Sequence, residues 1–135
     1  MISAEQRLLT AAREAATHAY TPYSGFPVGA ALETVDGRLF TGCNIENASF
    51  GLSMCAERAA VAQAVTAGCQ RFVRIAIVAG TGPEPTLPCG ACRQVLAEFA
   101  SPSLECLLAS LDQVDRVHRF TLADLLPHPF TLKPA

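Results

Sequence analysis

The stretch RFVRIAIVAG, residues 71–80, is a nearly continuous run of apolar residues that ends at a glycine. Such a run predicts a buried strand. The chain on both sides of it favours helices: residues 54–67 end at Gly68, and residues 89–100 end before the sequence SPS. A buried strand between two helices belongs in a sheet whose faces are covered by helices.

The rest of the chain supplies four more strands and two more helices. Ser3 and Gln6 have the spacing of a helix capping box, and Asp36-Gly37 is a tight-turn sequence. In chain order, the further predictions are a helix over 4–19, a β-hairpin over 28–46, strands in LECLLAS (104–110) and VHRF (117–120), and a short helix in TLADLL (121–126). This order predicts an α/β protein with a mixed five-stranded sheet and right-handed strand-to-helix crossovers.

Length and composition predict a single domain over residues 1–135. Half of the 135 residues (50%) are hydrophobic, which is enough for one core. The formal net charge is -2, and the basic residues are scattered rather than gathered in a stripe, so we expect no nucleic-acid partner. The apolar runs are too short to span a membrane, and the N-terminal MISAEQRLL lacks a signal-peptide pattern. A cytoplasmic location is therefore expected.

The six cysteines indicate metal or redox chemistry, because no secretory signal accompanies them. Cys89 and Cys92 in PCGACRQ are three residues apart, so one helical turn brings both thiols within reach of a single ion. A CxxC pair also occurs in redox proteins, after the first strand of a thioredoxin-like unit. Here the pair follows the third predicted strand, and Cys55 occupies a matching position at the start of another helix.

Cys55 and Glu57 are two residues apart, which in a regular helix separates their directions by about 200°. Both cannot be ordinary helical ligands of one ion. We therefore expect Cys55 at the helix start, as a ligand, and Glu57 as a proton-transfer group beside the metal. Three thiolates leave one position of tetrahedral zinc open to water, as in catalytic sites. Their excess negative charge favours a nearby cation, for which Arg58 is the candidate.

The motifs CAE (55–57) and PCGACRQ (88–94) match the three-cysteine form of the zinc deaminase signature. Together with SGFPVGAAL (24–32), TGCNIENASFGLSMCAERAA (41–60) and LLPHPF (125–130), they give a chain that resembles the small homotetrameric cytidine deaminases over nearly its whole length. This resemblance implies a three-layer α/β/α fold and one Zn²⁺ per subunit. It also implies hydrolytic deamination of cytidine and 2′-deoxycytidine to the uridine products and ammonia, as in pyrimidine salvage.

The resemblance also implies roles for individual residues. They are zinc binding by Cys55, Cys89 and Cys92, proton transfer by Glu57, contacts to the ribose hydroxyls by Asn44 and Glu46, further substrate contacts by Ile45 and the Ala56 backbone, packing on the pyrimidine by Phe26 and Phe130, and hydrogen bonds to the ligand thiolates by Arg58. Phe130 would reach the site of a neighbouring subunit. Phe50 departs from the family, because many relatives have tyrosine there.

Two other functions remain open from the residues. One is deamination of a modified cytosine nucleoside of the blasticidin type, whose enzymes share CAE and PCxxC. The other is a non-catalytic zinc-stabilised binding module, which needs a fourth ligand such as Cys43 or His118. Cys43, Cys69 and Cys106 are otherwise expected to be inert thiols. A free nucleoside is the expected substrate, because Glu46 would repel a phosphate at the sugar end.

Overall fold

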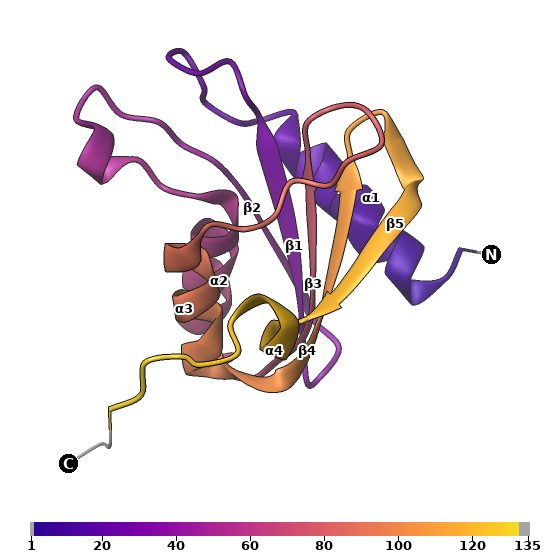
Figure 1. Cartoon of the computed structure of the whole chain (residues 1–135), viewed down its shortest axis with the longest axis vertical. Helices are drawn as coiled ribbons and strands as arrows, with labels where there is room; N and C mark the ends of the chain where they lie inside the picture. Colours follow the sequence, from indigo (N-terminus) through magenta and orange to yellow (C-terminus); the bar gives the residue numbers. More distant parts are fainter. Residues whose placement is uncertain (1, 133–135) are drawn as a thin grey trace.

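A five-stranded sheet lies between two layers of helices in the structure, a computed structural model that describes residues 2–132 (Figure 1). The elements are α1 (Ala4–Ala16), β1 (Val28–Thr34), β2 (Leu39–Cys43), the 3-10 turn η1 (Phe50–Leu52), α2 (Ala56–Thr66), β3 (Phe72–Ala79), α3 (Gly90–Phe99), β4 (Ala100–Ser110), β5 (Gln113–Thr121) and α4 (Leu122–Leu125). The predicted order of helices and strands is confirmed, with η1 as an addition. No helix within these residues is both long and apolar enough to cross a membrane.

The sheet is mixed, with the strand order β2-β1-β3-β4-β5. β3 and β4 are parallel, and the other three neighbouring pairs are antiparallel. β3 lies at the centre, where Ile77 is opposite Ala30 of β1 on one side and Leu108 of β4 on the other. Parallel neighbours need a long crossover, and α3 supplies it between β3 and β4. The buried run that predicted the central strand therefore organises the whole sheet.

Alternate residues of the central strand face two separate cores. Ala76 and Val78 pack with α1 on one face, together with Leu107 of β4. Ile75 and Ile77 pack on the other face, beneath α2, α3 and α4. Figure 1 shows the same division, with α1 on one side of the sheet and α2 and α3 on the other. The predicted three-layer α/β/α class is confirmed.

Some element boundaries differ from those predicted. The first helix ends at Ala16, three residues earlier than expected. The strand predicted over 104–110 begins four residues earlier, because β4 starts at Ala100 and includes the sequence SPS. Ala100 pairs with Phe72 at the start of β3, so the chain passes from helix directly into the sheet. Pairing with a neighbouring strand thus extends β4 beyond its apolar segment.

Two strand glycines allow helices to lie directly on the sheet backbone. A Cβ atom on Gly29 would lie 1.8 Å from the backbone oxygen of Ala12 in α1. A Cβ atom on Gly42 would lie 2.5 Å from the backbone oxygen of Ala56 in α2. Contacts this short with backbone atoms cannot be relieved by a side-chain rotation. Gly42 therefore sets how closely the first turn of α2 approaches β2.

We expect Gly42→Ala to lower the free energy of unfolding by about 2–3 kcal/mol, because α2 must move away from β2 to admit the methyl group. Gly51→Ala is the matched control, since no atom lies within 4 Å of the position its Cβ would take. Urea unfolding of both variants at equal protein concentration measures the difference. Equal stability of the two variants would show that this close approach is not what constrains α2.

Candidate metal centre and active site

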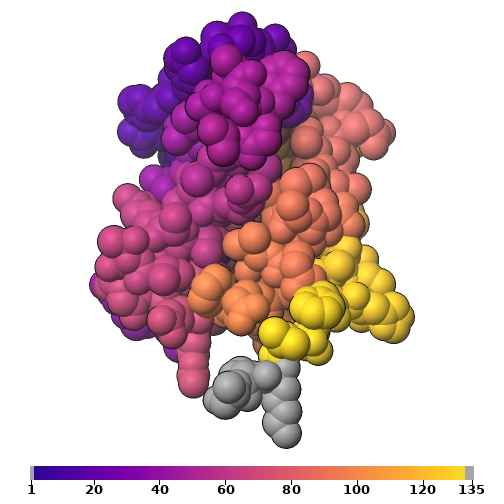
Figure 2. Space-filling model, turned by 90° about the vertical axis from the view of Figure 1, so that its left-hand side faces the viewer, coloured from indigo at the N-terminus to yellow at the C-terminus, as the bar shows by residue number. Residues whose placement is uncertain are grey.

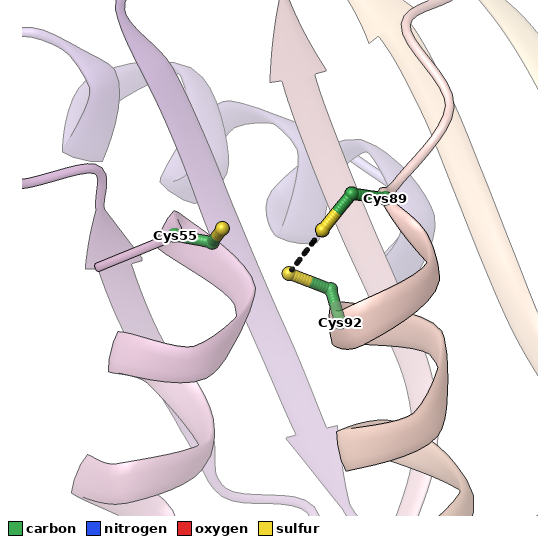
Figure 3. A group of neighbouring side chains, drawn as sticks. All are labelled: Cys55, Cys89 and Cys92. Atoms are coloured by element: carbon green, nitrogen blue, oxygen red, sulfur yellow. Dashed lines mark hydrogen bonds between the residues drawn. The ribbon is translucent and has the colours of Figure 1, made fainter. Parts of the chain in front are cut away.

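Three cysteines meet where the N-termini of α2 and α3 approach each other (Figure 3). Cys55 immediately precedes α2 and Cys89 immediately precedes α3, each with an extended backbone and no side-chain capping bond. Cys92 lies in the first turn of α3 and is buried. The two helix starts carry free backbone N–H groups and positive dipole ends, which favour thiolates. The geometric conflict between Cys55 and Glu57 is resolved because Cys55 stands outside the regular helix.

The sulfur positions fit one zinc ion. The three Sγ atoms lie within 4.8 Å of one another, and Sγ of Cys89 is 3.5 Å from Sγ of Cys92. Zinc–sulfur bonds of about 2.3 Å in a tetrahedron place sulfurs about 3.8 Å apart. A disulfide needs about 2.05 Å, so these cysteines are free thiols. The fold thus brings together the three cysteines that the sequence predicted to bind zinc.

No fourth protein ligand joins the cluster among residues 2–132. Nε2 of His118 lies 3.0 Å from the backbone oxygen of Pro83, away from the thiols. Cys43 is half-buried at the end of β2, and it too is outside the cluster. A metal held by three protein ligands keeps a position open, which is typical of a catalytic site and not of a structural one.

The thiols differ in how readily they ionise. Burial acts to raise the pKa of Cys89, but backbone N–H groups of Cys92 and Ala91 and the adjacent thiols together lower it. Burial raises the pKa of Cys55 and of Cys92, and the negative charge of Glu57 adds to both shifts. Three ionised sulfurs in this setting therefore require a cation between them. The donor set fits a divalent, thiophilic metal such as zinc.

Glu57 is a buried carboxylate beside the thiols, and the residue is only 5% exposed. It lies in the first turn of α2 and lines the cavity next to Cys55 and Cys89. Burial raises its pKa, although its own backbone N–H, the Cys92 thiol and the charge of Arg58 act to lower it. A carboxyl group whose pKa moves toward neutrality can both accept and release protons at the working pH. Burial of this kind separates Glu57 from an ordinary helix-surface glutamate.

Cys55, Cys89 and Glu57 border a cavity of about 250 Å³. Its walls are Val28, Asn44, Glu46, Ser53, Met54, Cys55, Ala56, Glu57, Ile77, Thr86, Leu87, Pro88 and Cys89. The walls are mostly apolar, with carboxylate, amide and thiol groups at defined places, which is the usual composition of a small-molecule site. Six residues expected from the sequence are among them. The apolar wall over 86–88 comes from an irregular Gly/Pro-rich loop, and the sequence carried no signal for its role.

Asn44 and Glu46 hold the segment before β1 in place. Asn44 accepts a hydrogen bond from the Val28 N–H and donates one to the Phe26 oxygen, each at 2.9 Å. Glu46 accepts bonds from the Tyr23 and Ser24 N–H groups and from the Ser24 hydroxyl. The Ser24 hydroxyl and these N–H groups overcome the effect of burial and lower the pKa of Glu46, which stays ionised. Sequence reasoning missed Ser24, which joins Glu46 to the SGFP loop.

Five of the residues expected at the site lie outside the cavity walls of a single copy, and one of them, Cys92, is buried in the thiol cluster. Phe26 is 42% exposed, Ile45 is 48% exposed and Phe130 is 72% exposed. Arg58 makes no hydrogen bond to a thiol among the residues described, and its charge acts on Glu57 instead. The walls of the cavity thus include no aromatic ring from residues 2–132.

Comparison with known proteins agrees with this geometry. The family described as "Cytidine and deoxycytidylate deaminase zinc-binding region" matches residues 2–107. The cytidine deaminase of Sporosarcina psychrophila is 44% identical over 126 residues, which cover 93% of this chain and 90% of that protein. The cytidine deaminase of Halalkalibacterium halodurans is 48% identical over 126 residues, covering 93% of each chain.

Solved structures show the same fold. The crystal structure of cytidine deaminase from Burkholderia pseudomallei is 46% identical, with a TM-score of 0.87 over 96% of this chain and 100% of that one. The crystal structure of cytidine deaminase from Mycobacterium tuberculosis is 43% identical, with a TM-score of 0.81 over 97% of this chain and 100% of that one. With its three-thiol cluster and buried glutamate, the chain belongs to the cytidine and deoxycytidylate deaminase family.

Proposed function

We propose that this single-domain protein is a zinc-dependent hydrolase that converts cytidine and 2′-deoxycytidine to uridine and 2′-deoxyuridine and releases ammonia. The observation that carries this proposal is the buried carboxylate of Glu57 beside three convergent thiols at one cavity. The names of similar proteins from two bacteria, both cytidine deaminases, support the choice of substrate.

Cys55, Cys89 and Cys92 would hold the zinc ion, one per subunit. Bound there, zinc supplies a Lewis acid that brings the pKa of a water ligand to about 7. Arg58, the residue after Glu57, brings a positive charge close to an otherwise anionic cluster. This charge offsets part of the repulsion between the carboxylate and the ionised sulfurs.

Glu57 would carry every proton of the reaction. It would take one proton from the attacking water and give it to ring N3. It would then take the proton of the hydroxyl newly bonded to C4 and give it to the amine as the C4–N bond breaks, so that cytidine and water become uridine and ammonia. A carboxyl group suits this sequence when its pKa is raised, because neither protonation state is then strongly disfavoured. The apolar cavity walls exclude competing water from the transfers.

Asn44 and Glu46 would bind the ribose hydroxyls at the cavity wall, while the Ala56 backbone meets the polar edge of the ring. Phe26 and Phe130 would pack on the pyrimidine, with Ile45 as a further contact. Phe130 would come from a neighbouring copy, which makes a homotetramer with shared sites the working assembly. Pyrimidine salvage in the cytoplasm is the setting that fits a nucleoside substrate.

A direct substrate comparison tests this proposal. The loss of ultraviolet absorbance that accompanies deamination would be followed for cytidine, 2′-deoxycytidine and blasticidin S at equal concentrations. We expect turnover of both nucleosides and little or none of blasticidin S. Turnover of blasticidin S alone would contradict the proposal and favour a deaminase of modified cytosines.

The negative charge of Glu46, which is proposed to bind the ribose, should exclude phosphorylated substrates. Because the ionised Glu46 lines the cavity, we expect kcat/KM for cytidine 5′-monophosphate to be about 100-fold or more below that for cytidine. Glu46→Gln should narrow the difference between the two substrates, because it removes the charge that repels the phosphate while weakening the ribose contact for both. Glu14→Gln makes the same charge change on an exposed residue of α1 and should leave the ratio unaltered. An unchanged ratio in Glu46→Gln would rule out charge repulsion by Glu46.

A further inference from the structure

Two polar residues that follow the thiols of α3 have no part in the proposed reaction, yet the side chain of each makes two hydrogen bonds. The Arg93 guanidinium donates from Nε to the Pro88 oxygen at 2.7 Å and from Nη1 to the Leu125 oxygen at 2.6 Å. It thereby joins the residue before Cys89 to the end of α4. The C-terminal segment is thus attached to the cysteine-bearing helix at a first point.

Gln94 makes the second attachment, and it uses both atoms of its amide. Nε2 of Gln94 donates to the Phe130 oxygen at 2.9 Å, and the Phe130 N–H donates to Oε1 of Gln94 at 3.1 Å. Both backbone polar groups of Phe130 are therefore satisfied by one half-buried side chain. A pair of bonds of this kind fixes the orientation of the residue as a strand partner would. The direction in which the Phe130 side chain leaves the backbone is fixed with it.

The aromatic ring held in this way has no core to fill. Phe130 is 72% exposed, and Figure 2 shows the C-terminal segment, in yellow, on the surface beside the orange segment that contains α3. Pro127 and Pro129 restrict the preceding backbone, so the segment is stiff as well as anchored. Ordering a residue opposes folding by about 1–2 kcal/mol, and an exposed phenylalanine gains no burial in return. Within one copy, the anchoring has no benefit for packing.

The cavity lacks an aromatic wall, which the Phe130 ring could provide. No aromatic residue lines it among residues 2–132, although stacking on an aromatic ring is a common way to hold a nucleobase. A second copy of the chain, with the same exposed and oriented Phe130, supplies a ring of the right chemistry. The two hydrogen bonds from Gln94 are then useful, because they hold the Phe130 ring in the orientation in which another copy can bind it.

We propose that Gln94 is a positioning residue, which clamps the Phe130 backbone so that the ring of one copy completes the cavity of another. The inference rests on the proposed function and adds a link between two active sites. Helix α3 carries Cys92 of its own metal site, and two residues later it carries Gln94, which orients Phe130 toward the cavity of another copy. Gln94 belongs neither to the thiol cluster nor to the cavity walls. Its replacement should therefore weaken substrate binding more than the chemical step.

A fluorescence measurement tests the clamp without using activity. The chain contains no tryptophan, so Phe130→Trp introduces a single indole reporter. Gln94→Met removes both hydrogen bonds with little change in length or helix propensity. We expect acrylamide to quench the reporter at least about twofold more strongly with Gln94→Met than without it. Glu98→Met, on the same helix and with no side-chain hydrogen bond to residues 2–132, is the matched control and should leave quenching unchanged.

Kinetics give the second readout. We expect Gln94→Met to raise KM for cytidine about tenfold, the amount that corresponds to one or two net hydrogen bonds, with kcat within about threefold of the original. Refolding Gln94→Met chains together with inactive Glu57→Gln chains should restore activity at the original KM. The Glu57→Gln chains supply an intact clamp and Phe130 to neighbours that retain Glu57.

Unchanged quenching and KM in Gln94→Met would overturn the inference, as would an absence of recovery in the mixed chains. Loss of the helical circular dichroism signal in Gln94→Met would also overturn it, because Gln94 would then serve folding alone. Failure of the proposed function looks different: the unaltered protein would not deaminate cytidine, while the quenching comparison would still report on the clamp.

Discussion

Replacing Glu57 with glutamine is expected to lower kcat for cytidine by about 10⁴-fold, because one side chain would serve as both base and acid. Glutamine keeps the size and hydrogen-bonding reach of the buried carboxyl group but cannot take up a proton. The cysteine cluster is unaltered, so zinc should stay near one ion per chain. Stopped assays of uridine formation, together with metal analysis of the same sample, measure both quantities.

Glu98→Gln provides the control for this change, since it makes the same substitution on an exposed residue of α3. It should retain full activity and zinc. If Glu57→Gln kept more than about a tenth of the original kcat, proton transfer by Glu57 would be excluded and another base would have to be sought. Loss of zinc in Glu57→Gln would instead assign the residue to metal binding.

Replacing Cys89 with serine is expected to remove both zinc and turnover. Its thiol is the one whose pKa is lowered by the surrounding N–H groups, so it supplies a thiolate most readily. Serine offers a much weaker ligand for zinc, and two remaining thiols do not hold the ion in an open site. We expect less than about a tenth of an ion per chain and a loss of activity of at least about 10³-fold, measured by atomic emission and by ammonia release.

Cys106→Ala is the matched control for the ligand set. Cys106 is a fully buried thiol on β4, and burial raises its pKa to about 11, so it stays neutral and packs as an apolar group. The variant should lose some stability but keep its zinc and its activity. Zinc retained in Cys89→Ser, or lost in Cys106→Ala, would contradict the assignment of the metal centre to the three convergent cysteines.

The sequence predicted those parts of the fold that local patterns determine. The run at 71–80 identified the central strand, and the prolines and glycines marked the ends of helices and the hairpin turn. The spacing of Cys55 and Glu57 even predicted that Cys55 lies outside the regular helix, as it does. What was wrong, such as the start of the fourth strand at Leu104 instead of Ala100, depended on a partner strand that no local pattern reveals.

The parts of the site that lie in short, local motifs could be predicted from the sequence. The metal-binding thiols and the glutamate lie at two helix starts, where spacing and chemistry can be read together. The pairing of Gln94 with Phe130 joins residues 36 positions apart through one side chain and two backbone groups. Backbone hydrogen bonds of this kind leave no periodic trace in a sequence. The roles proposed for Asn44, Ile45 and Phe26 rest on resemblance, and no physical pattern in the chain would have suggested them.

One zinc ion and Glu57 together are expected to make this protein a nucleoside deaminase. The most direct test is to measure zinc content and ammonia release from cytidine on a single preparation, before and after removal of the metal with a chelator. We expect about one zinc per chain and one ammonia for each uridine formed. Chelation should remove zinc and activity together, and added zinc should restore them. A fully zinc-loaded protein that releases no ammonia from cytidine would contradict this expectation and would indicate a zinc-stabilised binding protein.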